Sequence, residues 1–234
     1  MLTGRIFRSF SVALLMALPT VLLADGGPHH TKNYQVTITN LTGGTLVQRG
    51  APAGQIMSPP VVATHNKHLD PLFVLGQPAS SDLWNVAEEA INGPLATTWG
   101  NSPSVMDVEQ GSAPIMPGQS ATIVVKASKG FSRISLVGML VTTNDGFYAL
   151  NGMRLPDFGS VAYYSPGYDA GTERDSELCS KIPGPPCNNH NVRDTTNAPG
   201  YVFIHSGIHG VGDLAPAQFD WKDPVAKITI TAEK

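Results

Sequence analysis

Acidic side chains in loops are the residues of this chain whose types and spacing best suit chemistry. Asp145 lies in an Asn-Asp-Gly turn, and Asp169 and Glu173 share the later loop Tyr-Asp-Ala-Gly-Thr-Glu. Hard cations such as calcium take roughly six to eight oxygen ligands from carboxylates, amides, carbonyls and water. Loops at one end of a β-sandwich could supply such ligands. The alternative is that these are ordinary turns, in which aspartate bonds its own backbone.

The histidines offer a second chemistry. His65 and His68 lie three positions apart, and His205 and His209 lie four apart. Such spacings bring two imidazoles together for zinc or copper only on a helix, whereas both segments have the composition of loops. The spacing therefore favours histidines that brace loops. A zinc or copper site, with histidine as a general acid or base near neutral pH, is the alternative.

Motifs for other enzyme chemistry are absent from the sequence. It contains no Gly-x-Ser-x-Gly nucleophile elbow, no phosphate-binding glycine-rich loop with its lysine, and no dinucleotide fingerprint. The zinc-protease pattern His-Glu-x-x-His is also missing. These absences favour a protein that binds something over one that catalyses a reaction.

The N-terminal segment has the pattern of a cleavable signal peptide. Arg5 and Arg8 precede an apolar run over residues 12–23, and the small residue Ala24 precedes a polar stretch. A membrane anchor is the alternative, but a spanning helix needs about 20 apolar residues, and this run is shorter and contains Pro19. The order of charge, apolar core and small residue predicts export, with cleavage after Ala24, to the periplasm or the medium.

Composition limits the partners. The chain has 15 basic and 18 acidic residues, and removal of residues 1–24 takes two arginines, which leaves a net charge of −5. An acidic protein lacks the general basic field that nucleic acids and anionic membranes attract. No second apolar segment is long enough to cross a membrane. We therefore expect neither nucleic acid nor a membrane span, and a protein or glycan surface as the partner.

The two cysteines, Cys179 and Cys187, are eight positions apart. In an oxidising compartment such a pair most simply forms a disulfide. Metal binding by the pair is the alternative, although a zinc site usually needs four ligands at recognisable spacings. We expect a disulfide that holds an irregular loop.

Periodicity predicts an all-β fold. The best helical pattern is residues 82–90, with Asp82 as its cap and Asn92-Gly93-Pro94 as its end. Residues 45–63 contain three prolines, so any strand there should be short or at an edge. Short strands, one short helix, long loops and no βαβ rhythm indicate an antiparallel sandwich. The predicted strands are residues 34–41, 121–127, 133–143, 148–155, 160–164, 201–205 and 225–232.

Several of these segments, taken in order, resemble the spondin N-terminal domain, and in particular its bacterial exported members. The likeness covers most of residues 34–232, and the ordered set of motifs is more specific than any one of them. The segments that carry it are residues 63–66, 73–80, 86–89, 135–147, 150–152, 168–173 and 207–214.

The resemblance implies an eight-stranded antiparallel sandwich similar to C2 domains, with a divalent ion, calcium, at one loop end. Two metal-ligand carboxylates of the family map onto Asp145 and Asp169. The place of a third falls at Lys126 or a neighbour, and a lysine there would repel a cation. Asn151 and Glu173 are expected to add oxygen ligands instead.

These observations give one division of the chain and one expected role. Residues 1–24 are the predicted signal peptide, residues 25–33 a flexible leader, and residues 34–234 one spondin-like domain. The expected role is a non-catalytic binding or adhesion module with a calcium site. A metal-dependent periplasmic hydrolase that uses the loop histidines is the alternative.

Overall fold

The computed structural model describes Met1 and residues 30–43 and 53–233; the predicted signal peptide, Met1 apart, and its cleavage point lie outside the described residues. Among the described residues, no helix is long and apolar enough to cross a membrane. The strands and helices, in chain order, are β1 (Lys32–Asn40), β2 (Val61–His65), α1 (Ser81–Glu89), α2 (Gly93–Gly100), β3 (Val105–Gln110), β4 (Ser120–Ala127), β5 (Arg133–Met139), β6 (Gly146–Arg154), β7 (Ser160–Ser165), β8 (Tyr168–Asp169), the 3-10 turn η1 (Cys179–Lys181), β9 (Phe203–Ile204), α3 (Pro216–Phe219) and β10 (Ala226–Ala232).

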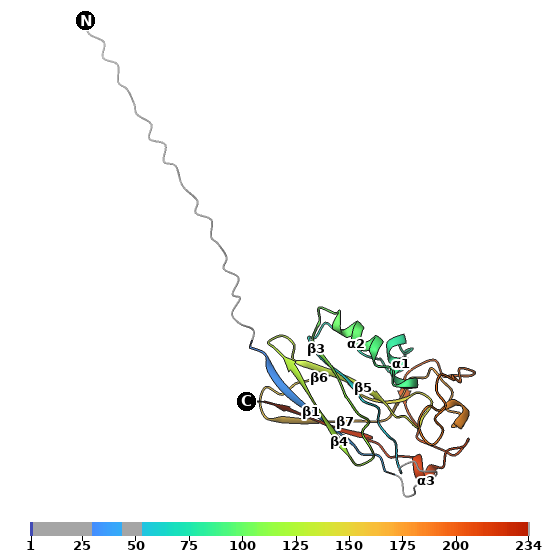
Figure 1. Ribbon diagram of the computed structural model, residues 1–234. Coiled ribbons are helices and arrows are strands. Elements are labelled where there is room, and N and C mark those ends of the chain that lie inside the picture. Colours follow the sequence, from blue (N-terminus) through green and yellow to red (C-terminus); the bar gives the residue numbers. More distant parts are fainter. Residues whose placement is uncertain (2–29, 44–52, 234) are drawn as a thin grey trace.

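Two antiparallel sheets pack face to face, which confirms the predicted sandwich (Figure 1). One sheet has the strand order β4-β1-β10-β7, and the other has the order β3-β2-β5-β6-β8-β9. β8 and β9 have two residues each, and every other described strand has five or more. The predicted strand over residues 201–205 is therefore much shorter than expected.

Alternation along β1 explains how the first sheet is held. Val36 and Ile38 are fully buried between the sheets. In the continuous register with the neighbouring strand β10, Val36 pairs with Ile230 and Ile38 pairs with Ile228. Burial of each such aliphatic side chain contributes about 1.5–3 kcal/mol to the free energy of unfolding. β1 begins at Lys32, so the last two residues of the predicted flexible leader belong to the sheet.

The second sheet is buried on both faces because helices cover its outer side. Leu136 of β5 points into the sandwich core, while the next residue, Val137, packs beneath α1 with Leu83 and Val86. Figure 1 shows α1 and α2 lying over this sheet. This double burial accounts for the nearly continuous apolar run of β5, which lies between β2 and β6 in the interior of the sheet.

Three local predictions need correction. The side chain of Ser80, not Asp82, caps α1, because its hydroxyl accepts a hydrogen bond from the amide of Leu83 at 3.2 Å. The Gly93-Pro94 stop signal instead begins a second helix, where proline is tolerated because the first helical amides need no intrahelical acceptor. The third correction concerns the number of elements, because the described residues form ten strands and three α-helices, whereas eight strands and one helix were expected. β2 is short, as expected, and lies between β3 and β5.

The segment from β8 to β9 is long and mostly irregular, and it is fixed at two places. Cys179 and Cys187 form the predicted disulfide, with their Cα atoms 4.7 Å apart, which is consistent with an extracytoplasmic location. Farther along, the guanidinium of Arg193 pairs with Glu88 of α1 at 2.6 Å and lies over the ring of Trp84. These anchors hold the loop against the end of the second sheet where β5 turns into β6.

Candidate metal centre

The turn between β5 and β6 delivers the first carboxylate. The hydroxyl of Thr143 donates to the carbonyl of Leu140 at 2.6 Å and accepts from the amide of Gly146 at 2.8 Å, which closes the turn around Asp145. β8 then pairs with the first residues of β6, with Gly146 opposite Asp169. Because the two strands are hydrogen-bonded neighbours, Asp145 and Asp169 lie side by side at the sheet end.

The loop that follows β8 binds one oxygen of each carboxylate. The amide of Gly171 donates to Oδ1 of Asp169 at 2.6 Å. The amides of Thr172 and Glu173 donate to Oδ2 of Asp145 at 2.7 and 2.9 Å, and the Thr172 hydroxyl adds a third bond at 3.1 Å. The other two oxygens, Oδ1 of Asp145 and Oδ2 of Asp169, are buried and have no hydrogen-bond partner. Buried carboxylate oxygens normally have one, so these two positions suit an additional ligand.

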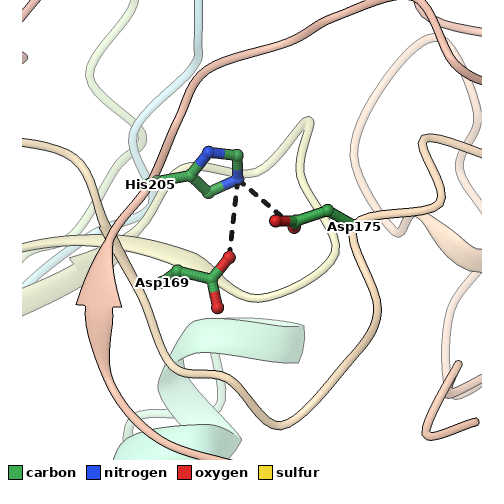
Figure 2. Close-up of side chains that lie close together, drawn as sticks. All are labelled: Asp169, Asp175 and His205. Carbon is green, nitrogen blue, oxygen red and sulfur yellow. Dashed lines mark ion pairs between the residues drawn. The ribbon is translucent and has the colours of Figure 1, made fainter. Parts of the chain in front are cut away.

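Asp175 and His205 complete the group (Figure 2). Nε2 of His205 lies 3.5 Å from Oδ1 of Asp175 and 3.9 Å from Oδ2 of Asp169. One ligand atom from each of these three residues falls within 4.8 Å of the other two. His205 and Asp169 are buried, whereas Asp175 remains about one-third exposed. The group is therefore closed toward the protein and open to solvent on the Asp175 side.

Burial and mutual repulsion make it unfavourable for the carboxylates of Asp145 and Asp169 to be ionised together. Burial raises the pKa of Asp169, and the charges of Asp145 and Asp175 raise it further. Burial also raises the pKa of Asp145, although hydrogen bonds from Glu173 and Thr172 oppose the change and Asp175 adds to it. A divalent cation would remove this penalty, because it stabilises all three carboxylates in their ionised form. The residues present therefore fit a divalent cation.

The hydrogen bonds of His205 determine what its ring can do. Nδ1 accepts a hydrogen bond from the amide of Gly207 at 3.0 Å, and the ring packs against Trp221. A neutral imidazole with Nδ1 as acceptor carries its proton on Nε2. Nε2 therefore faces Asp175 and Asp169 as a donor. Histidines that bind metal ions use an unprotonated nitrogen and usually donate from the other one, which is the reverse of this arrangement.

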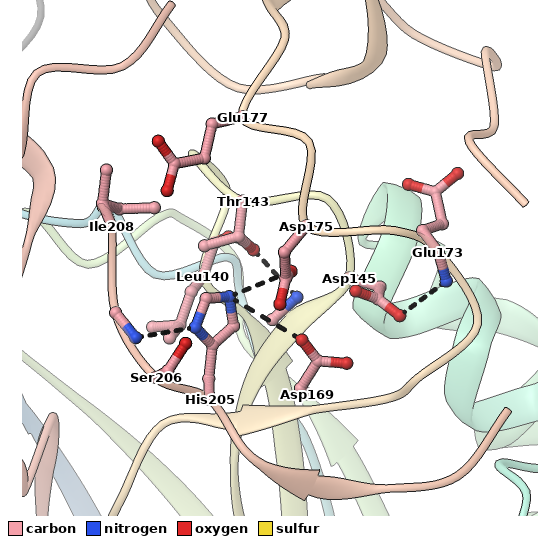
Figure 3. Close-up of polar contacts among 12 residues, drawn as sticks. Leu140, Thr143, Asp145, Asp169, Glu173, Asp175, Glu177, His205, Ser206 and Ile208 are labelled. Atoms are coloured by element: carbon pink, nitrogen blue, oxygen red, sulfur yellow. Dashed lines mark hydrogen bonds and ion pairs between the residues drawn. The ribbon is translucent and has the colours of Figure 1, made fainter. Parts of the chain in front are cut away.

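A neighbouring carboxylate braces the loop that carries His205. Glu177 is buried, and its carboxylate accepts hydrogen bonds from the amides of His209, Gly210 and Val211 at 2.6, 2.7 and 2.9 Å. Figure 3 shows Glu177 on the opposite side of the ring of His205 from Asp169. Because its oxygens are occupied by backbone donors, Glu177 serves to position the loop and is no candidate for the cation.

The other predicted site residues have separate roles. The carboxylate of Glu173 accepts a hydrogen bond from the amide of Asp194 at 2.7 Å, and burial raises its pKa to about 8. Glu173 thus contributes its amide, through the bond to Asp145, rather than its side chain. Asn151 lies six residues along β6, roughly 20 Å from Asp145, where its amide group bonds the backbone of Leu72 and Phe73. Asn151 is therefore not part of this group.

Lys126, the residue expected to repel a cation, lies elsewhere. It belongs to β4, its carbonyl accepts from the hydroxyl of Thr64, and Thr64 pairs with Ile134 near the start of β5. The carboxylates lie beyond the other end of β5. His65 is also at the distant end, where its ring nitrogens contact Asn66 and Ser135 as a loop-bracing histidine should. Hence neither Lys126 nor His65 contacts the cluster of Asp145, Asp169 and Asp175.

Two members of the group, Asp175 and His205, were not among the expected calcium ligands. Asp175 extends the acidic run of the 168–175 loop, so its proximity in sequence was a usable signal. His205 was considered only together with His209, as a zinc or copper site or as the acid or base of a hydrolase. In the structure its neighbours are the carboxylates of Asp169 and Asp175. His209 itself contacts Ser206 at 2.9 Å and is not one of the three.

Gly171 is expected to be the most sensitive glycine of the site. Its φ is +67°, and an added Cβ would lie 2.0 Å from the carbonyl oxygen of Tyr201. Gly159 has the same φ with nothing within 4 Å, so Gly159→Ala isolates the cost of the left-handed conformation, about 1–2 kcal/mol. Gly171→Ala should lower the free energy of unfolding by clearly more than that in urea denaturation. Equal losses in the two variants would contradict the close packing of this loop.

No protein-family model and no curated protein sequence matches the chain. What the site can do therefore follows from its own residues and geometry.

Proposed function

We propose that this chain is an exported, non-catalytic binding or adhesion module whose loop end holds a divalent cation, calcium. One observation carries the proposal: Asp145 and Asp169 each keep one buried oxygen without a partner, while the loop fixes the other oxygen. Asp175 contributes a third, partly exposed carboxylate. Calcium bound to these oxygens would keep coordination positions free on the open side, where an acidic group of a partner could bind.

The chemistry of the donors favours calcium over a transition metal. Carboxylates and water suit calcium, magnesium and manganese, whereas zinc and copper favour imidazole and thiolate ligands. The only imidazole of the group, that of His205, presents a proton to the carboxylates. His205 then orients Asp175, whose Oδ1 lies 3.5 Å from Nε2, as groups around a metal site commonly do. Oδ2 of Asp169, at 3.9 Å, is too far away to accept a hydrogen bond from it.

Kinship with the spondin N-terminal domain family is part of the same proposal. Its support is the ordered set of motifs and the position of Asp145 and Asp169 at one loop end of an antiparallel sandwich. In that family the fold serves adhesion, and a protein or glycan surface is the partner class that we propose here.

The enzymatic alternative rests on one contact, the 3.5 Å approach of His205 to Asp175. A hydrolase would need His205 as a zinc ligand or as an acid or base, so its replacement should abolish metal binding or activity. We expect instead that His205→Gln, whose amide nitrogen can still donate, binds calcium within about threefold of the wild-type affinity, about 0.6 kcal/mol. Calorimetric titration with calcium and with zinc measures this. Tight zinc binding that is lost in His205→Gln would favour the hydrolase.

A surface-binding assay tests the proposed role. Mature protein carrying a fluorescent label would be incubated with intact cells and with an array of immobilised glycans, in calcium and in chelator. The proposal expects calcium to increase retention, and it expects this calcium-dependent part of the retention to disappear in Asp169→Asn. The exposed Asp70 supplies a matched control, since Asp70→Asn should be retained like the wild-type protein. If no cells and no glycans retain the wild-type protein in calcium, the adhesion role is wrong.

A further inference from the structure

A cluster of basic side chains lies at the end of the sandwich away from the carboxylates. Arg133 begins β5 and Arg154 ends β6, and the two are direct partners in the antiparallel register. Like charges placed opposite each other across two strands destabilise a sheet. Arg133 directs one nitrogen to the carbonyl of Gly152 at 2.6 Å, which fixes its guanidinium beside its partner strand.

A hollow of about 500 Å³ opens between these arginines and the turn that follows β2. Lys67, His68 and Phe131 line it together with Arg133 and Arg154. Within the described residues, the ion pairs formed by side chains involve none of these basic groups. The hollow is therefore a concave site with at least three positive charges and no acidic side chain among the residues that line it.

Positive charge also surrounds an adjoining hollow. A second hollow of about 340 Å³ shares Phe131 and its two neighbours and is lined by Lys32 and Lys129. The acids nearest to these hollows are Asp157, which lines the second one, and Asp70, which lines a third with Lys67 and Arg133. Positive charge thus predominates here, although the whole chain carries a net charge of −3.

Oxyanions are the ligands that such a site recognises best. The planar guanidinium groups of two adjacent arginines can each form paired hydrogen bonds to a phosphate or sulfate, and lysine adds a point charge. The hollow is far larger than a single oxyanion and falls within the roughly 300–1,000 Å³ of small-molecule sites. The half-buried ring of Phe131 offers an apolar wall for the remainder of the ligand. Single-stranded nucleic acid, by contrast, is bound by several stacked aromatic rings.

We propose that this hollow binds a phosphate or sulfate group carried on a saccharide. Arg133 and Arg154 would hold the oxyanion, Lys67 would contribute charge from the opposite wall, and the sugar ring would lie against Phe131. The hollow shares no residue with the candidate metal centre formed by Asp145, Asp169, Asp175 and His205. It therefore stands independently of calcium binding and gives the module a second contact with an extracellular surface.

A sulfated hexasaccharide prepared from heparin and labelled for fluorescence polarisation is the probe. The double variant Lys67→Gln/Arg154→Gln removes two charges from the hollow, and Lys222→Gln/Lys227→Gln removes two from elsewhere on the surface. We expect the first to weaken binding about tenfold or more and the second less than about twofold, at about 50 mM salt where charges are weakly screened. Asp169→Asn should bind the probe like the wild-type protein, which separates this site from the cation site.

Competition with inorganic sulfate can overturn the proposal, and so can four results of direct binding assays. They are the absence of wild-type binding at about 1 mM probe, an equal loss in both double variants, equal affinity for uncharged maltohexaose, and tighter binding to anionic phosphatidylglycerol vesicles or to a single-stranded DNA oligomer. Inorganic sulfate is the last arm of the test. Displacement of the probe by sulfate at concentrations no higher than those of the hexasaccharide would assign the hollow to the free ion and overturn the saccharide.

Discussion

Asp169→Asn is expected to stabilise the cation-free protein at pH 8 and to abolish its stabilisation by calcium. Asp169 is fully buried beside Asp145 and Asp175, so folding without a cation must either bury its charge or protonate it. An asparagine keeps the oxygen that accepts from Gly171 and places an amide donor where the unpartnered oxygen stands. The gain should be about 1–3 kcal/mol, the usual penalty for an unsatisfied buried polar group.

Calcium should reverse the order of stability. At a concentration about 100 times its dissociation constant, a ligand that binds only the folded state adds about 2.7 kcal/mol to the free energy of unfolding. The wild-type protein should gain that amount, and Asp169→Asn should gain almost nothing. Urea unfolding in chelator and in calcium measures both effects, with Asp70→Asn as the exposed control. A variant that is less stable than the wild-type protein in chelator would show that the carboxylate, without any cation, stabilises the fold.

Stability in chelator is expected to fall as the pH rises from about 6.5 to 8. Burial raises the pKa values of Asp145, Asp169 and Glu173, the last to about 8. In the unfolded chain these groups titrate near pH 4. The folded state therefore binds more protons across this range, and linkage makes the free energy of unfolding decrease with rising pH. Each group contributes at most about 1.4 kcal/mol per pH unit.

The pH range is chosen to keep His205 out of the measurement. Burial lowers the pKa of His205, so its unfavourable protonation costs stability only as the pH falls below about 6.5. With calcium present the slope should become shallower, because the ion binds the ionised carboxylates of Asp145 and Asp169 and removes their proton uptake, while Glu173 keeps its own contribution. Urea midpoints at several pH values, each with chelator and with calcium, give the two slopes. Parallel slopes would mean that calcium does not act on these carboxylates.

The strands were predictable where one side of a strand faces the core. β1 and β10 alternate along their length, and the structure follows that alternation residue by residue. β2 was not predictable in this way. All five of its residues are buried, because one face of the strand packs in the core between the sheets and the other packs beneath the helices, so the strand shows no alternation of apolar and polar residues. The second helix was hidden by its own first residues, because Gly93 and Pro94 act equally well as a stop and as a start.

The candidate site was predictable only in its regular part. Asp145 and Asp169 follow predicted strands, and the family resemblance assigned both to one loop end. The pairing of β6 with β8, which sets them side by side, was not predicted. His205 joins them through a loop of more than thirty residues, residues 170–202, that is fixed by a disulfide and by the contact of Arg193 with α1. Such long-range contacts leave no periodic pattern in sequence. The same limit hid the pairing of Arg133 with Arg154, which depends on the register of β5 and β6.

Metal analysis of the purified mature protein tests the central claim most directly. The wild-type protein, Asp145→Ala and Asp169→Ala would be dialysed against calcium, analysed for elemental content and melted with and without chelator. We predict stoichiometric calcium in the wild-type protein alone, and a melting temperature that chelator lowers only there. A wild-type protein that retains no divalent ion and melts at the same temperature in chelator would contradict the calcium site.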